Sequence, residues 1–301
     1  MRNLNLVAFI ALLTSGFQAE CQSDKASSMV PDKWINFRHS TSPGQQFSYN
    51  GEKWNAAAED IYAKIWLPVL LKEKYKLIVG PYYRAEQIEF EGATHEELAC
   101  IDHWNLRSAG IDSKLQVKLG EQRSLLFGVN FSQAASTENL SLKSTKIGYT
   151  ATALYRKRFS TNEELGFGVI YGNNLSGITI LPIILWNKTF NDRYGVELAA
   201  PYKLAMRYNA SDKDIFHLKS EGDSRNYLVP NGTDLNRYSR VDLRMGLSYT
   251  RLINRWIGVE VFSGYRRNLR SELPNGITLK KNSGLATSVE LFVIPAFKKG
   301  K

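Results

Sequence analysis

Apolar and polar residues alternate along much of this chain. The clearest stretch is 240–249, where the odd-numbered residues from Val241 to Tyr249 are apolar and most even-numbered residues are charged or small. Successive side chains of a β-strand point to opposite faces, so a period of two predicts a strand with one apolar and one polar face. The same pattern recurs about a dozen times. It predicts an all-β fold.

The individual strands follow from this alternation and from the turn residues between them. We predict strands at 34–42, 60–71, 76–89, 108–119, 124–132, 146–159, 165–171, 178–186, 194–208, 215–227, 240–249, 256–266 and 284–294. Pro201 interrupts 194–208, which is therefore one strand or two. Two strands there give a total of 14, which we favour; one strand gives 12, after loss of one marginal strand. Residues 178–186 are apolar on both faces, 215–227 alternate poorly, and Pro81 predicts a bulge or local break.

The connections sort by length onto two ends. Short ones at 72–75, 120–123, 160–164, 191–193 and 253–255 alternate with longer ones at 91–107, 133–145, 228–237 and 268–283, with a short exception at 173–177. Bacterial barrels have short periplasmic turns and longer extracellular loops, and a tilted strand of about nine residues spans a bilayer. We therefore predict a closed antiparallel transmembrane β-barrel of 12–14 strands over residues 34–297. A soluble sandwich or calyx is the alternative, and it requires neither feature.

The N-terminus has the layout of an export signal. Arg2 precedes the apolar run 6–13 and a small-residue exit that ends at Cys21, which predicts a signal peptide over 1–21 and a polar lead-in over 22–33. Lipidation of Cys21 is the alternative, disfavoured because Glu20 stands before the cysteine. If Cys21 leaves with the signal, Cys100 is the only cysteine of the mature chain, and an internal disulfide is excluded.

Composition narrows the class of protein. Mean hydropathy is −0.30, and no stretch reaches the roughly 18 apolar residues of a transmembrane helix, which argues against a helical membrane protein. The formal charge is +10, but Lys and Arg are scattered, so we predict no nucleic-acid partner. The charge suits anionic lipid head groups of an outer membrane. The 15 Tyr, 14 Phe and 6 Trp suit the aromatic girdles of a barrel.

Three segments carry a resemblance to a known group of proteins. They are the signal ending at 18–22, the hairpin 65–71 with 80–83, and the apolar last strand 289–294. In these the chain resembles the uncharacterised outer-membrane β-barrel families, domains of unknown function, common in the Gram-negative Bacteroidota. The resemblance implies outer-membrane lipid and the barrel assembly machinery as partners, and no catalytic residues. The basic tail 298–301 departs from the aromatic ending that this machinery reads, a role that Phe292 or Phe297 could take.

The polar faces of the strands supply the candidate site. The predicted lumen-lining residues are Asp60, Lys64, Arg84, Glu86, Asp112, Lys114, Lys118, Arg240, Asp242, Arg244, Glu260, Arg266 and Glu290. They form either a charged pore lining that selects solutes or a pairing network that fills a narrow barrel. A barrel of this size holds water unless it is plugged, and 22–33 or the loop 91–107 could be the plug. Gly166, Gly168 and Gly172 share a strand and are expected to relieve crowding inside the barrel.

Other chemistry has little support in the sequence. His95, Cys100 and His103 lie in the loop 91–107, but their spacing matches no established metal motif, so we predict neither metal nor cofactor. His39 and Ser40 are adjacent and point to opposite strand faces, which is unsuitable for a nucleophile and its base. His217 stands alone. We therefore predict no catalytic residues.

The function predicted from the sequence is transport. We expect a passive pore or small-solute transporter of unknown substrate in the cell outer membrane. The first alternative is a non-conducting barrel that acts as an adhesin, receptor or structural element through its extracellular loops. The second is an enzyme with its site at the rim of the barrel.

Overall fold

The computed structural model describes residues 33–49, 52–91, 104–136, 147–175, 177–231, 234–272, 280–281 and 284–294. The predicted signal peptide, the lead-in up to residue 32, the core of the loop 91–107 and the basic tail lie outside these residues. Within them the chain forms strands and turns, and no helix is long and apolar enough to cross a membrane.

The strands run close to the predicted ones, with longer ends. They are β1 (Ile35–Tyr49), β2 (Glu52–Ile65), β3 (Leu67–Leu71), β4 (Tyr75–Glu91), β5 (Trp104–Lys118), β6 (Arg123–Ser136), β7 (Gly148–Ser160), β8 (Glu163–Leu175), β9 (Gly177–Thr189), β10 (Tyr194–Ala200), β11 (Lys203–Asn209), β12 (Asp214–Asn231), β13 (Asp234–Leu252), β14 (Ile257–Glu272), β15 (Lys280–Lys281) and β16 (Gly284–Val293).

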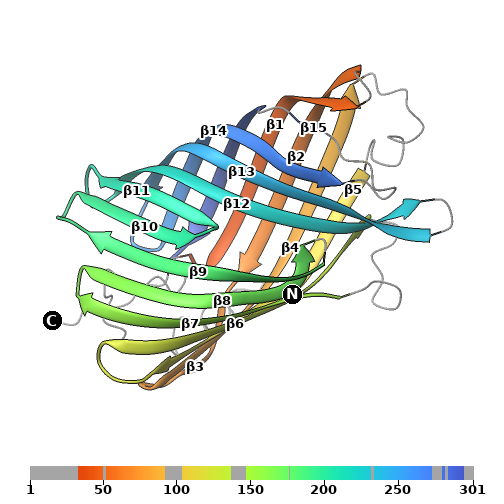
Figure 1. Cartoon of the computed structure of the whole chain (residues 1–301). Helices are drawn as coiled ribbons and strands as arrows, with labels where there is room; N and C mark the ends of the chain where they lie inside the picture. Colours follow the sequence, from red (N-terminus) through yellow and green to blue (C-terminus); the bar gives the residue numbers. More distant parts are fainter. Residues whose placement is uncertain are drawn as a thin grey trace, which may run out of the picture.

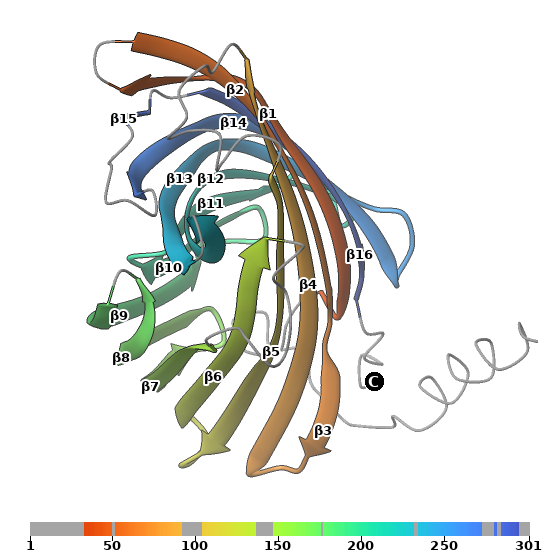
Figure 2. The same ribbon diagram turned by 90° about the vertical axis from the view of Figure 1, so that its right-hand side faces the viewer.

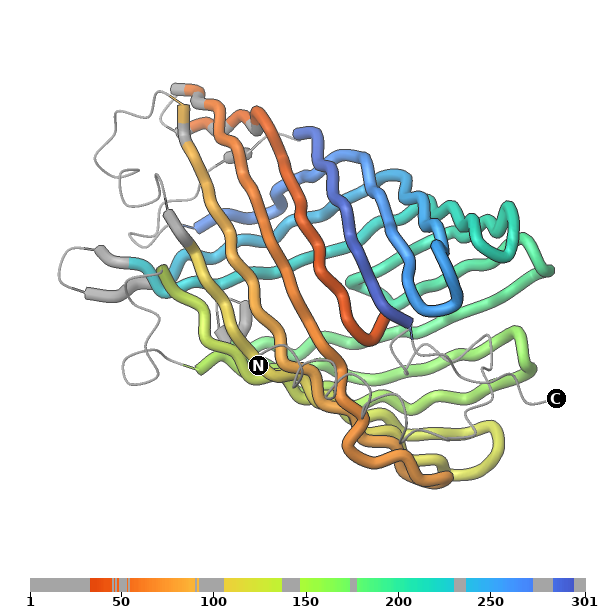
Figure 3. Tube along the Cα trace, turned by 180° about the vertical axis from the view of Figure 1, so that it is seen from behind, coloured from red at the N-terminus to blue at the C-terminus, as the bar shows by residue number. Residues whose placement is uncertain are grey.

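These segments close into one barrel. Strands pair with the next in sequence order except around two short segments: β2 and β3 both pair with β4, and β14 pairs with β16 while β15 pairs with β1. β1 completes the ring by pairing with both β2 and β16. Figure 3 shows β1 and β16 side by side, and Figure 2 shows the ring from the end that carries the longer connections. Because β3 continues β2 and β15 is a two-residue segment, the barrel has 14 strands. Pro201 separates β10 from β11, which confirms the count of 14.

Two predicted features differ in the structure: the connection at 228–237 and the break at Pro81. The predicted long connection at 228–237 is wrong, because β12 and β13 stay paired as far as Asn231 and Asp234. Its Asn and Pro residues resemble a loop locally, but the cross-strand ladder continues through them. The bulge or break predicted at Pro81 does not interrupt β4, which is continuous. The interruption lies in the strand beside it, at Trp66 between β2 and β3.

The outer face of the barrel is apolar and ringed by aromatic side chains. Leu247 is 64 % exposed and Ile180 is 66 % exposed. Near the longer connections the rings of Tyr149 and Tyr171 lie 6.0 Å apart, and Phe159 is exposed at the opposite end of β7. At about 3.3 Å per residue and a tilt of about 40°, the span from residue 149 to residue 159 is roughly 25 Å, the height of a lipid-facing band.

The inner face differs between the two sides of the barrel. On β6, β7 and β9 it carries a buried apolar cluster that includes Leu126, Leu154 and Leu185. On the β8 strand between them, a Cβ at Gly168 would lie 2.2 Å from the backbone oxygen of Ala153 and 2.9 Å from a methyl group of Leu154. The absence of a side chain at Gly168 lets Leu154 pack closely over this part of β8, as the glycine pattern predicts. The opposite wall carries most of the charged residues.

Candidate functional site

Eight charged side chains meet inside the barrel, and we refer to them as the charge cluster. They come from β2, β4, β12, β13 and β14, and are Asp60, Arg84, Glu86, Asp223, Arg225, Arg240, Asp242 and Arg266. Four are acidic and four are arginines, so the cluster is neutral as a whole. Six of them belong to the predicted lumen-lining set. Asp223 and Arg225 do not, because the poor alternation of β12 hid its polar face.

Glu86 is the centre of the cluster. It is fully buried, with 0 % of its surface exposed. Its Oε2 lies 2.9 Å from Nη1 of Arg225 and accepts a hydrogen bond of 3.1 Å from the hydroxyl of Tyr227, both on β12. Its Oε1 accepts a hydrogen bond from Arg240 of β13. Since β4 and β12 are far apart in the strand order, these contacts join opposite walls of the barrel.

The remaining members extend the network in two directions. Asp60 lies 3.5 Å from Nε of Arg84 and 3.3 Å from Nη2 of Arg225. On the other side, Asp242 lies 2.7 Å from Nε of Arg240 and accepts a 3.0 Å hydrogen bond from Nε of Arg266. Burial of a charge is costly unless partners surround it. Each arginine and each carboxylate here has at least one such partner.

An apolar layer lies above the cluster, towards the longer connections. Leu106, Ala135 and Val229 are each completely buried, and the rings of Tyr227 and Tyr238 stack with centroids 6.5 Å apart. At this level β12 leaves its place in the wall and forms a parallel bridge to β6, with Leu228 opposite Ala135. Two walls of the barrel therefore meet at this end.

The other predicted residues lie below or beside the cluster. Lys64 forms an ion pair with Asp112, and Lys114 stands 4.9 Å from the centre of the Trp66 ring. Glu260 and Glu290 lie 2.8 and 2.9 Å from Nζ of Lys33. Arg244 lies 3.1 Å from Glu221. Lys118 is exposed at the end of β5, beside the turn.

Lys33 stands just before β1 and links the start of the described chain to the barrel wall. Burial disfavours its charged form, but the attraction of Glu260 and Glu290 and their hydrogen bonds outweigh this effect and raise the pKa of Lys33. The side chain also lies 4.6 Å from the centre of the Phe292 ring. It thus neutralises part of the acidic charge at the short-turn end of the interior.

A cavity of about 600 Å³ lies next to the charge cluster. One side is the inner face of β7, β8 and β9, with Thr150, Ile170 and Leu181. The other side is β12, with Asp223 and Ser224. Its volume falls within the 300–1,000 Å³ range of small-molecule sites, and its lining combines aliphatic, hydroxyl and carboxylate groups.

The cavity lies where the barrel wall is incomplete. The β10–β11 hairpin is only seven residues high on each side. Its pairing with β9 ends at Ala200 opposite Ile184, and its pairing with β12 ends at Lys203 opposite Glu221. Beyond the hairpin tip, no ladder among the described residues joins β9 to β12. Figure 1 shows the short hairpin with the longer β9 and β12 on either side of it.

The side chains of β12 change at the same level. Below the hairpin tip, Phe216 and Leu218 are exposed on its outer face. Above it the same face carries Ser220, Gly222, Ser224 and Asn226. Gly222 donates its N–H to the backbone oxygen of Tyr202 at 2.7 Å, at the hairpin tip. The upper part of β12 therefore presents small and polar groups to the cavity, where a strand in the wall would present apolar groups to lipid.

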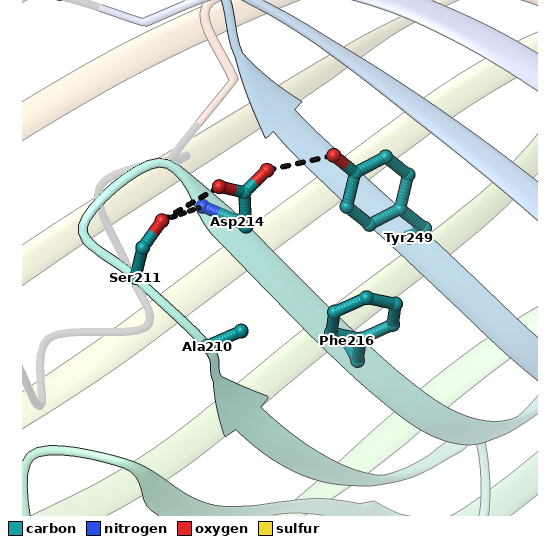
Figure 4. Close-up of a pocket in the computed structure, with 5 residues that line it drawn as sticks. All are labelled: Ala210, Ser211, Asp214, Phe216 and Tyr249. Atoms are coloured by element: carbon teal, nitrogen blue, oxygen red, sulfur yellow. Dashed lines mark hydrogen bonds between the residues drawn. The ribbon is translucent and has the colours of Figure 1, made fainter.

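A second, shallow hollow at the short-turn end has a structural explanation. It is lined by the turn residues Ala210, Ser211 and Asp214 and by two rings. Asp214 accepts hydrogen bonds of 2.7 Å from the hydroxyls of both Ser211 and Tyr249, as Figure 4 shows, and another from Arg251. Its carboxylate is thus fully engaged in holding the turn between β11 and β12.

The described residues contain no group of three or more His, Cys, Asp or Glu side chains placed to hold a metal ion. The loop with His95, Cys100 and His103 lies outside them. His39 is exposed on the outer face of β1, and Ser40 is on the inner face, as the alternation predicts.

The chain matches one protein family and is similar in fold to several solved structures. A family model described as a domain of unknown function (DUF6268) matches residues 108–274, more than half of the chain. No curated protein matches the sequence. Among solved structures, the chain is similar to an outer membrane channel from Pseudomonas putida F1, with a TM-score of 0.47, 11 % identity, and coverage of 91 % of this chain and 100 % of that chain. It is also similar to a FadL homologue of Pseudomonas aeruginosa (TM-score 0.49, 10 % identity, coverage 87 % and 90 %) and to LpxR from Salmonella typhimurium (TM-score 0.38, 7 % identity, coverage 85 % and 99 %).

Proposed function

Starting from a chain that belongs to the DUF6268 family, we propose that this protein is an outer-membrane channel for small solutes. The observation that carries the proposal is the cavity of about 600 Å³ between β12 and the wall β7–β9. A barrel that served only as a scaffold for its outer loops has no need of such a space. The apolar outer band of roughly 25 Å supports placement in a membrane.

The route follows the β7–β9 side of the barrel. The charge cluster and the apolar layer occupy the interior between β4 and β12 to β14, so solutes pass beside them. Ile170 lines the cavity and also packs against the buried apolar cluster of Leu126, Leu154 and Leu185. The interior path therefore has an apolar wall on one side and the charged wall on the other. The charged residues select solutes from one side of the path, and they do not encircle an open pore.

Liposome swelling tests this function. The refolded mature chain in phospholipid vesicles is expected to admit small neutral sugars and amino acids, with rates that fall steeply with solute size. Gly222→Trp is expected to slow swelling at least five-fold. A Cβ there has 3.8 Å to its nearest neighbour and therefore fits without a clash, and Gly222 lines the cavity, so the indole is expected to occupy part of it.

The matched control is Gly120→Trp in the exposed β5–β6 turn, where nothing lies within 4 Å of an added Cβ. This variant is expected to swell like the wild type. Equal swelling of the two variants would show that solutes do not use the cavity. Absence of swelling with the correctly folded wild type would contradict the channel function itself.

A further inference from the structure

We propose that the break in the wall between β9 and β12 is a lateral opening that connects the cavity with the outer leaflet of the membrane. We further propose that the cavity takes small molecules with an apolar body and one polar end. The inference deepens the proposed function, since the opening is one mouth of the same route. One end of the solute route then opens sideways into the membrane, and not along the axis of the barrel.

The pairing of the strands supports an opening at this place. Backbone N–H and C=O groups in the hydrocarbon layer must be paired, and an open strand edge is tolerated only where it lines a cavity. The edges of β9 and β12 above the hairpin tip meet this condition, because Leu181 of β9 and Ser224 of β12 line the same cavity. The tip of the β10–β11 hairpin is thus the lower edge of the opening, and we call this edge the sill.

The break in the wall lies at the depth of the outer leaflet. Ile180 pairs with Tyr171 on β8, and Tyr171 belongs to the aromatic pair at the upper membrane boundary. The sill, at Ile184, lies four residues further down β9. The lower part of the opening is therefore below the boundary, within the outer leaflet. Ile180 beside it is 66 % exposed, as expected for a side chain that meets lipid.

The two sides of the cavity differ in chemistry, which favours a ligand with two different ends. The β8–β9 side offers Ile170 and Leu181, which suit an aliphatic or aromatic body. The β12 side offers Ser224 and Asp223, whose side chain is 24 % exposed although it pairs with Arg225. A ligand that enters from the leaflet with its apolar part against β9 can direct a hydroxyl or amide towards β12. A fully polar solute lacks the first interaction, and a pure hydrocarbon lacks the second.

Site-directed fluorescence quenching tests the opening without a transport assay. In a chain with Cys21→Ser and Cys100→Ser, a bimane label is attached at Ser224→Cys. Leu218→Cys, on the same face of β12 below the sill, is the lipid-facing reference. Ser40→Cys, on the inner face of β1, is the interior reference. The proteins are placed in phosphatidylcholine vesicles with spin-labelled phosphatidylcholine or aqueous iodide.

We expect the label at 224 to be quenched by the lipid-borne quencher at least half as strongly as the label at 218. We also expect iodide to quench it more strongly than it quenches 218, since the site is both open to lipid and polar. Lipid quenching at 224 no greater than at 40 would overturn the lateral opening. That result would leave the channel proposal standing, since liposome swelling decides it separately.

The ligand class is tested with the same label. Addition of 4-butylphenol is expected to shift the emission at 224 saturably, with no saturable shift at 218 or 40, while arabinose causes none. In the Gly222→Trp background the shift at 224 is expected to disappear. A shift at 224 that never saturates, or one equally produced by arabinose, would overturn the assignment of an amphipathic ligand.

Discussion

Arg225 and Glu86 face each other across the interior of the barrel, with 2.9 Å between Nη1 and Oε2. They come from β12 and β4, strands that are not neighbours in the sheet. Arg240 holds the second oxygen of the same carboxylate. One acidic side chain therefore ties two opposite walls together, in a part of the barrel where a simple pore would hold water.

Loss of the Glu86 charge is expected to destabilise the barrel. Glu86→Gln keeps the shape of the side chain but leaves the neutral cluster with one excess positive charge, although Arg225 keeps Asp60 and Arg240 keeps Asp242. An uncompensated buried charge costs about 3–5 kcal/mol. The urea midpoint for unfolding in lipid vesicles should fall accordingly. Glu73→Gln, the same change in the exposed β3–β4 turn, should leave the midpoint unchanged. Equal midpoints for both variants would mean that the cluster adds no stability.

A charge on the lipid-facing band is expected to impair insertion. Leu247 is 64 % exposed on the outer face of β13, and arginine at the membrane midplane costs about 2–4 kcal/mol. Leu247→Arg should therefore reduce the folded fraction in vesicles, read from the heat-dependent shift in gel mobility. Ile253→Arg places the same charge in the exposed turn between β13 and β14, where the cost is about 0–1 kcal/mol. A smaller folded fraction for Ile253→Arg would reverse the depth assigned to this hairpin.

The alternation of side chains was sufficient to predict the barrel, because each strand needs one face for lipid and one for the interior. Val241 to Tyr249 are the clearest example, and the family match supports the predicted resemblance to a barrel family of unknown function. The proposed bacterial group stays a prediction. The 228–237 connection was wrongly predicted because a ladder between β12 and β13 overrides loop-like residues such as Pro230.

The site was less predictable than the fold. Alternation identified Glu86, Arg240 and Asp242 as facing inwards, but it could not show that they meet side chains of a distant strand. Arg225 was missed because β12 has lipid on its outer face at Leu218 and the cavity at Ser224. A strand that changes its surroundings half-way along cannot keep one period. The poor alternation of 215–227 was therefore itself the signal of the wall opening.

Gly168 of β8 is expected to be essential for the close packing of β8 against β7. A Cβ at Gly168 would lie 2.2 Å from the oxygen of Ala153 and 2.8 Å from Cα of Leu154, so Gly168→Ala requires a backbone shift. Overpacking of this kind costs about 1–3 kcal/mol, measurable as a lower urea midpoint. Gly222→Ala, with no neighbour closer than 3.8 Å, is the control. Tolerance of Gly168→Ala would show that β8 can move away from the apolar cluster.

Lys33 is expected to stabilise the barrel in a way that depends on pH. Its folded pKa is raised above the ordinary value of 10.5, because Glu260 and Glu290 outweigh the effect of burial. A raised pKa stabilises the folded state fully at pH values below 10.5, and this contribution disappears as the pH rises through the folded value. Wild type should therefore be more stable than Lys33→Met at pH 8, and the difference in urea midpoint should shrink above pH 10.5. Lys53→Met changes an exposed lysine of β2. It is the control for the general effect of high pH on the urea midpoint. A difference that stays constant up to pH 12 would mean that Lys33 acts through its packing against Phe292 and not through its charge.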